Sequence, residues 1–259
     1  MSSILLKIEN NIAFIVLNRP EVFNSFNREM AFSLQSTLDN CAIDTNVRAI
    51  VITGNGKAFC AGQDLKEVTD PELNPGFRKI LEEHYNPIIL KIRTIEKPII
   101  AAVNGVAAGA GANIALACDI VVAAENASFI QAFSKIGLIP DSAGTFFLPR
   151  LIGFQKASAI MMLGDKINAL EAFNMGMIYK IIAPGLFDEE VRNLAATLAQ
   201  MPTKALGLTK RLLNQSMANN LEQQLALESD LQIEASSSND YKEGVTAFVE
   251  KRTPEFKGN

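Results

Sequence analysis

The sequence has 259 residues, of which 48% are hydrophobic and 20% are charged, and its formal net charge is −4. This composition suffices for a substantial core in one large domain, and it gives no sign of a polyanionic partner such as DNA. The three cysteines lie far apart and there is one histidine, which argues against disulfides, zinc sites and histidine-based catalytic triads.

The two ends of the chain carry no recognisable targeting signal. Residues 1–7 lack a basic segment followed by a long apolar stretch, as a secretory signal would have. Residues 256–259 do not match an organelle address, and no apolar run reaches the length that crosses a bilayer. We therefore expect a cytoplasmic protein without nucleic-acid or membrane partners.

Short apolar runs rich in β-branched residues and bounded by turn residues predict buried parallel strands. These runs are Ile12–Leu17, Ala49–Thr53, Ile99–Val103 and Ile120–Ala124. Apolar residues at helical spacing predict helices over Met30–Cys41 and Phe77–Ile95, the second of which ends at Lys97-Pro98. Alternating strands and helices indicate an α/β fold with right-handed crossovers.

The strand runs stop after about residue 185. Pro202-Thr203-Lys204 opens a predicted helix, and residues 219–236 and 241–251 have helical patterns, with a break at Ser236–Asn239. We therefore divide the chain into a core of residues 1–195 and a helical section of residues 196–259.

Two glycine-rich turns follow predicted strands, within Thr53–Leu65 and Asn104–Asn113. Neither is a nucleotide-binding fingerprint, because Phe59 and Ile114 stand where the third glycine belongs. Small residues let a ligand approach the backbone, and a helix N-terminus offers unpaired N–H groups, so the two turns could form an oxyanion hole. Tight packing of helix on sheet explains the same residues, and both interpretations remain open.

Asp141 follows a proline and precedes small residues and an apolar helix. It could cap that helix. It could instead act as a catalytic carboxylate, if apolar neighbours such as Ile139, Phe146 and Phe147 raise its pKa. The residues alone favour neither interpretation.

Three other segments are weaker candidates. Asn168–Glu171 is typical of a capping box, to which we assign no chemistry. His84-Tyr85 predicts the wall of the core or of a pocket, with proton transfer as the alternative. Lys251-Arg252 predicts a solvated helix end, with phosphate binding as the alternative.

With these segments in view, the chain resembles the crotonase family, the enoyl-CoA hydratase/isomerase group, over nearly its whole length. The resemblance is carried by Asn18–Glu21 with Asn24–Asn27, by Ala58–Leu65 and by Ala101–Gly111. It implies a spiral of ββα units with a C-terminal helical trimerisation region. It also implies a coenzyme A thioester as substrate, no separate cofactor, no metal, and assembly as a trimer or dimer of trimers.

The resemblance further implies roles for individual residues. The backbone N–H groups of Gln63 and Ala110 would bind the thioester oxygen, and Asp141 would be the catalytic group. Contacts with the acyl group or coenzyme A are implied for Phe23, Ala61, Asp64, Leu65, Tyr85, Asn113 and Phe133, and for Phe248 and Lys251 of a neighbouring subunit.

Typical hydratases of the family carry one glutamate where this chain has Asn113 and another where it has Phe133. The resemblance therefore implies isomerisation of an acyl-CoA, by shifting a double bond or opening a ring epoxide, rather than addition of water. The alternatives are an enoyl-CoA hydratase and a non-catalytic acyl-CoA-binding member.

Overall fold

The structure, a computed structural model, describes residues 2–259. Its strands are β1 (Ile4–Glu9), β2 (Ile12–Leu17), β3 (Ala49–Gly54), β4 (Ala58–Cys60), β5 (Ile99–Val103), β6 (Val106–Ala108), β7 (Ile120–Ala124), β8 (Ser128–Ile130), β9 (Lys166–Asn168) and β10 (Lys180–Ile182). Its α-helices are α1 (Arg28–Ile43), α2 (Leu65–Thr69), α3 (Phe77–Lys79), α4 (Asn86–Thr94), α5 (Ala110–Ala117), α6 (Gly144–Ile152), α7 (Phe154–Leu163), α8 (Ala169–Asn174), α9 (Phe187–Gln200), α10 (Thr203–Ser216), α11 (Leu221–Ser236) and α12 (Asn239–Glu250). A π-helix, Ile80–Tyr85, joins α3 to α4, and 3₁₀ helices span Pro20–Val22, Ala132–Ile136 and Pro184–Leu186.

The described strands form two sheets, with the orders β1-β2-β3-β5-β7-β10 and β4-β6-β8-β9. In the larger sheet β1 and β2 are antiparallel and the other neighbours are parallel. In the smaller sheet β4, β6 and β8 are parallel and β9 is antiparallel to β8. The α/β class and the buried parallel strands predicted from the apolar runs are therefore confirmed.

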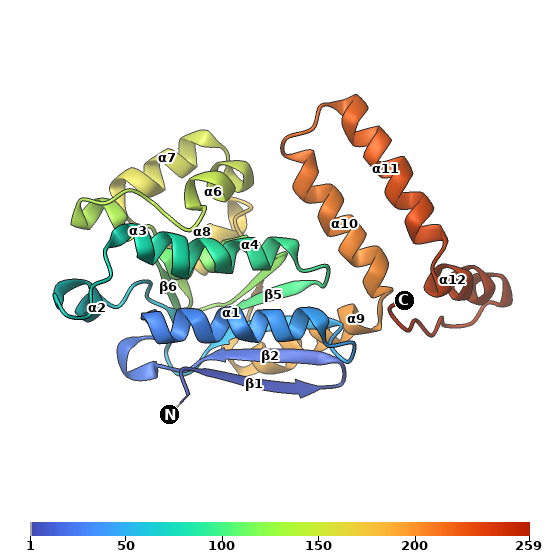
Figure 1. Cartoon of the computed structure of the whole chain (residues 1–259), viewed down its shortest axis with the longest axis horizontal. Helices are drawn as coiled ribbons and strands as arrows, with labels where there is room; N and C mark the ends of the chain where they lie inside the picture. Colours follow the sequence, from blue (N-terminus) through green and yellow to red (C-terminus); the bar gives the residue numbers. More distant parts are fainter. Residues whose placement is uncertain (1) are drawn as a thin grey trace.

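The core lies between the larger sheet and the helices that cover it (Figure 1). Every residue of β5 is buried, and α1 buries Met30, Leu34, Leu38 and Cys41 along one face, as its helical spacing predicts. All eight residues of α5 are buried too. Asn113 is the one polar side chain of this helix. Because protein packs around the helix on all sides, the position of its N-terminus is fixed.

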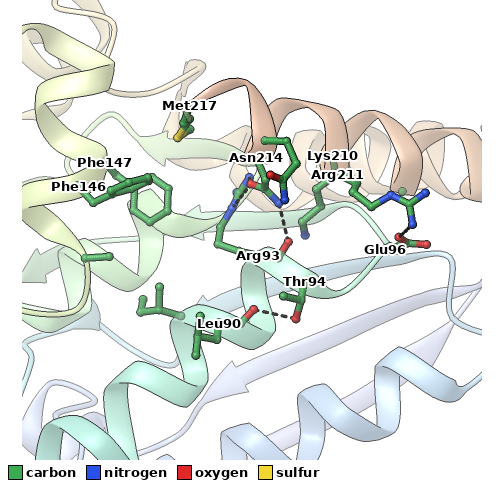
Figure 2. A pocket seen from close by; sticks show the side chains of 14 residues that line it. Leu90, Arg93, Thr94, Glu96, Phe146, Phe147, Lys210, Arg211, Asn214 and Met217 are labelled. Carbon is green, nitrogen blue, oxygen red and sulfur yellow. Dashed lines mark hydrogen bonds and ion pairs between the residues drawn. The ribbon is translucent and has the colours of Figure 1, made fainter. Parts of the chain in front are cut away.

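Helices α10, α11 and α12 extend away from the sheets at the C-terminal end of the chain (Figure 1). Buried and half-buried charges attach α10 to the core, because Asp119 pairs with Arg93 at 3.0 Å and with Lys210 at 2.8 Å. Arg93 also donates to Asn214 of α10, and the Asn214 amide donates back to the Arg93 carbonyl oxygen (Figure 2). Beside these contacts a cavity of about 510 Å³ separates α10 from α4 and α6.

The predicted helix break and capping box are confirmed. Helix α11 ends at Ser236 and α12 begins at Asn239, and Asn168 and Glu171 form a capping box at the start of α8. None of the helices within residues 2–259 is both long enough and apolar enough to cross a membrane.

Candidate active site

The two glycine-rich turns meet because the strands before them are neighbours. Cys60 at the end of β4 pairs with Ala107 of β6 in the parallel ladder. A Cβ added to Gly111 would lie 2.3 Å from the Cys60 carbonyl oxygen, so no larger residue fits there. A Cβ added to Gly62 would lie 3.5 Å from the Ala110 nitrogen. The small residues thus serve close packing, and this packing brings the two turns side by side.

The backbone N–H of Gln63 is left free by the pairing of its neighbours. The Phe26 N–H donates to the Gly62 carbonyl oxygen at 2.7 Å, and the Asp64 N–H donates to the Phe26 carbonyl oxygen at 2.8 Å. In a parallel pairing the N–H of the residue between Gly62 and Asp64, which is Gln63, points away from the paired segment at Phe26. Across residues 2–259 the Gln63 N–H has no hydrogen-bond partner.

Ala110 offers a second free N–H group. It is the first residue of α5, so its N–H has no partner within the helix. Gly109 before it has φ 53° and ψ −128°, a conformation that favours glycine. No partner for the Ala110 N–H is found elsewhere in the described chain. Two unpaired N–H groups on adjoining turns are the arrangement that an oxyanion hole requires.

A cavity of about 730 Å³ opens beside these turns. Its lining is mostly apolar and consists of Ser25, Ala61, Gly62, Gln63, Leu65, Val68, Phe77, Ile80, Tyr85, Gly109, Ala110, Ala132, Phe133, Lys135, Ile136, Leu138 and Asp141. Asp141 is the only carboxylate in this lining. A mostly apolar cavity with a few convergent polar groups is typical of a ligand site.

Asp141 does not cap α6, so the capping interpretation is wrong. The N-cap position belongs to Ala143, with φ 59° and no side-chain cap. The Asp141 carboxylate accepts a hydrogen bond from the Ser142 hydroxyl at 2.8 Å. Burial raises the pKa of Asp141, and the bond from Ser142 opposes that rise.

The apolar residues that share the cavity with Asp141 are not the ones predicted to surround it. Tyr85, Phe133 and Leu138 line the same cavity as Asp141. Ile139 is instead 83% exposed, and Phe146 and Phe147 line the cavity beside α10 (Figure 2).

Asn113 lies behind the cavity wall and not in its lining. Its side-chain nitrogen donates to the Asp141 backbone oxygen at 2.8 Å, and its side-chain oxygen accepts from the Gln131 amide at 2.7 Å. A Cβ added to Gly144 would lie 2.4 Å from the Asn113 amide nitrogen. Asn113 therefore holds the turn that carries Asp141, and the glycine at 144 makes room for it.

Of the other predicted contact residues, Ala61, Leu65, Tyr85 and Phe133 line the cavity, but Phe23 and Asp64 do not. Phe23 is 52% exposed, and its carbonyl oxygen accepts from the Ala61 N–H at 3.0 Å. The Asp64 carboxylate accepts from Arg19 at 2.8 Å and caps α2 through the Lys66 N–H at 3.0 Å.

Phe248 and Lys251 lie near the end of α12, outside the lining of this cavity. Phe248 is 84% exposed. A single chain therefore does not bring these two residues to the site. Their predicted approach to a neighbouring subunit stays a prediction.

Sequence reasoning missed a hydrogen-bonded group beside the cavity. The Tyr85 hydroxyl donates to the Gln63 side-chain oxygen at 2.8 Å, and the Gln63 amide nitrogen donates to Glu67 at 2.7 Å. The π-helix turns both His84 and Tyr85 inward, where each is 1% exposed. An inserted residue of this kind is frequent at functional sites. Within residues 2–259 no group of three or more histidine, cysteine or acidic side chains could hold a metal ion.

Comparison with known proteins places the whole chain in one group. The sequence model described as enoyl-CoA hydratase/isomerase matches residues 7–259. The chain is 44% identical over 260 residues to 1,2-epoxyphenylacetyl-CoA isomerase of Escherichia coli, covering 100% of this chain and 99% of that protein. It is also 44% identical over 256 residues to a probable enoyl-CoA hydratase of Rhodobacter capsulatus, covering 99% and 98% of the two chains.

Solved structures agree with the sequence comparison. A crystal structure of a putative enoyl-CoA hydratase/isomerase from Mycobacterium abscessus has a TM-score of 0.92 to this chain at 35% identity. The match covers 99% of this chain and 100% of that one.

Proposed function

Since the chain belongs to the enoyl-CoA hydratase/isomerase family, we propose that it isomerises an acyl-CoA thioester, by shifting a double bond or opening a ring epoxide beside the thioester carbonyl. One observation carries this proposal. Asp141 is the only carboxylate that lines the main cavity of the described chain, and it shares that cavity with Gln63 and Ala110. A single base beside an oxyanion hole can remove a proton and return it elsewhere.

The two free N–H groups stabilise the enolate in the proposed reaction. The thioester oxygen accepts from Gln63 and Ala110, and its negative charge grows when a proton leaves the neighbouring carbon. Removing one such donor lowers kcat by about 10²–10³-fold in known cases. The donors are backbone groups on packed turns, so they need no rearrangement when charge develops.

Asp141 moves the proton. The C–H bond beside the carbonyl breaks, its electron pair enters the enolate, and the proton goes to the Asp141 carboxylate. The same proton then returns to a carbon further along the acyl chain, so the double bond comes to lie next to the carbonyl. Burial, which raises the pKa of Asp141, makes it a stronger base for this step.

Hydration is the second candidate, and the equal similarity to the probable hydratase of Rhodobacter capsulatus favours it. Adding water requires carboxylates that position and activate a water molecule. Where typical hydratases carry them, this chain has Asn113, which is 1% exposed and engaged in hydrogen bonds, and Phe133. We therefore rank isomerisation first.

The acyl group is proposed from the relatives. The E. coli relative is named for a ring-epoxide phenylacetyl thioester, which would place this chain in phenylacetate breakdown, whereas a 3-enoyl thioester would place it in fatty-acid metabolism. The proposal invokes no cofactor beyond the coenzyme A of the substrate. Assembly as a trimer or dimer of trimers stays part of the same proposal.

Ultraviolet absorbance tests the reaction type. We expect the purified protein to convert 3-enoyl-CoA into the conjugated 2-enoyl thioester, with rising absorbance, or to convert the ring epoxide into a rearranged isomer of equal mass. A hydratase would instead bleach 2-enoyl-CoA by adding water. Hydration of 2-enoyl-CoA without turnover of either isomerase substrate would overturn the proposal.

A further inference from the structure

The turn that carries Asp141 contains two strained residues. Ser142 has φ 50° and Ala143 has φ 59°, and a residue other than glycine adopts such a conformation only where the surrounding structure imposes it. The Asp141 carbonyl oxygen accepts from the Gly144 N–H at 2.9 Å and from the Asn113 side-chain nitrogen at 2.8 Å. Gly144 belongs to the turn itself. The bond from Asn113 is therefore the one that ties this carbonyl group to another part of the fold.

The Asp141 carbonyl oxygen also sets the orientation of two side-chain amides. A carbonyl oxygen can only accept, so Asn113 must turn its NH₂ group toward Asp141. The Asn113 side-chain oxygen then faces Gln131, which donates its own NH₂ group at 2.7 Å. The side-chain oxygen of Gln131 is buried and has no hydrogen-bond partner within residues 2–259. Folded proteins rarely leave a buried polar group unpaired, and here that cost accompanies the bond to Asn113.

Gln131 stands at a well-fixed place between the end of β8 and the first turn of α5. It is 2% exposed and follows Ile130, the last residue of β8. The Ile130 carbonyl oxygen accepts from the Gly109 N–H at 2.8 Å, and the Gly109 carbonyl oxygen accepts from the Asn113 N–H at 3.2 Å. The same first turn begins with Ala110, whose N–H is one of the two proposed oxyanion donors.

We propose that Gln131 is a positioning residue, which fixes the Asn113 amide so that the first turn of α5 holds the strained Asp141 turn in place. The base and the Ala110 N–H are then carried by one rigid unit. This inference rests on the proposed role of Asp141 and extends it to a residue outside the cavity lining. Gln131 acts on the Asp141 turn through Asn113.

The position of the base matters because proton transfer depends steeply on distance. Without the donor at Gln131, the buried oxygen of Asn113 would have no partner, and the Asn113 amide would hold the Asp141 carbonyl group less firmly. The strain at the next two residues would then move the turn. A misplacement of about 1 Å can cost about 10²-fold in rate. The backbone bonds of Gly109 do not involve the Gln131 side chain, so the oxyanion donors keep their positions.

Replacing Gln131 with methionine removes the donor and keeps the length of the side chain. We expect kcat to fall about tenfold because the base is less firmly placed. We expect KM to change by less than about twofold, because the thioester oxygen still binds both N–H groups. Hydrogen–deuterium exchange reports the turn without any turnover. The Gly144 N–H, which is bound to the Asp141 carbonyl oxygen, should exchange about tenfold faster than in the wild type.

Asn113→Ala tests whether Gln131 acts through Asn113. Alanine keeps α5 helical but removes the bond to the Asp141 carbonyl oxygen, so kcat should fall about 10²-fold. Adding Gln131→Met to Asn113→Ala should then change kcat and the exchange of the Gly144 N–H by less than about twofold, because the connection is already broken. If Gln131 merely supported the fold, the two losses would multiply.

Ser128→Ala is the matched control within β8. Ser128 is 1% exposed, and its hydroxyl has no hydrogen-bond partner in the described part of the chain. This substitution changes a buried polar side chain of the same strand without removing a bond to Asn113. It should leave both kcat and the exchange of the Gly144 N–H unchanged.

A Gln131→Met protein with the wild-type kcat, or with the wild-type exchange of the Gly144 N–H, would overturn the inference. Losses that multiply in the double variant would overturn it as well. If the wild-type protein has no isomerase activity, the proposed function fails, and the exchange measurements still decide whether Gln131 holds the turn.

Discussion

Replacing Asp141 with asparagine removes the proposed base with little disturbance of its surroundings. The new amide oxygen can still accept from the Ser142 hydroxyl, which now lies at 2.8 Å from the carboxylate. The Asn113 amide and the Gly144 N–H both bind the backbone oxygen of residue 141, at 2.8 and 2.9 Å, and are untouched. The turn should therefore keep its conformation.

We expect Asp141→Asn to lose activity because the base is missing, and not because the fold changes. A positioned general base contributes about 10²–10⁴-fold to the rate. A loss of about 10³-fold corresponds to about 4 kcal/mol of transition-state stabilisation. Because the substrate is held by the two N–H groups and the cavity, KM should change by less than about threefold, and kcat should carry the loss.

Asp141→Asn should lower activity but should not lower the stability of the folded protein. Burial raises the pKa of Asp141 above its ordinary value of 3.8, so the folded protein holds the charged form less well than the unfolded chain does. This cost is absent at pH values below 3.8 and present once the pH exceeds the folded-state pKa. Asp141→Asn should thus melt at or above the wild-type temperature at pH 7, with the difference vanishing in acid.

Initial rates with 3-enoyl-CoA and with the ring epoxide, together with melting curves, check both expectations. Turnover within about threefold of wild type by a folded Asp141→Asn protein would refute the assignment of the base. A folded protein with low kcat but a greatly lowered melting temperature would refute the stability argument alone.

Two further substitutions test the support of the site. Gly62→Ala places a Cβ 3.0 Å from the Ala108 carbonyl oxygen, at a backbone φ of +91°. We expect this substitution to lower kcat about 10²-fold, as the loss of an oxyanion donor does. An unchanged kcat would contradict the close packing of the two turns. Asp119→Asn removes the negative charge that lies 2.8 Å from the Lys210 ammonium, whose side chain is 6% exposed. Urea unfolding should show a loss of about 3 kcal/mol, whereas a loss below about 0.5 kcal/mol would mean that α10 is held by other contacts.

The parts of the fold with a strong local signal could be predicted from the sequence. The runs of β2, β3, β5 and β7 are long enough to be recognised by their apolar, β-branched composition, and α1 is long enough to show its helical spacing. The short strands β4, β6, β8 and β9 have three residues each and show no period. They nevertheless bring the two glycine-rich turns together.

Site residues could be predicted from the sequence only where the residue type itself points to a function. Small residues at Gly62 and Gly111 and a lone acid at Asp141 were visible as candidates. The contact of Asp64 with Arg19 and that of Asn113 with the Asp141 turn could not be predicted, because these partners lie far away in the sequence. Arg19 lies 45 residues from Asp64, and the Asp141 carbonyl lies 28 residues from Asn113.

The hydrogen-bonded chain at the cavity wall was hidden for another reason. Gln63 and Tyr85 are 22 residues apart, and a π-helix sets which side of the segment faces inward. A period of 3.6 residues misplaces side chains after such an insertion. The Arg28 N–H, which donates to Glu67, lies 39 residues from it in the sequence.

A crystal structure of the Asp141→Asn protein with bound 3-enoyl-CoA tests the central claim most directly. We expect the thioester oxygen within about 2.7–3.1 Å of both the Gln63 and the Ala110 nitrogen atoms, and the side chain of residue 141 beside the carbon that loses its proton. A thioester bound with its carbonyl turned away from these two nitrogen atoms, or with residue 141 remote from that carbon, would contradict the account.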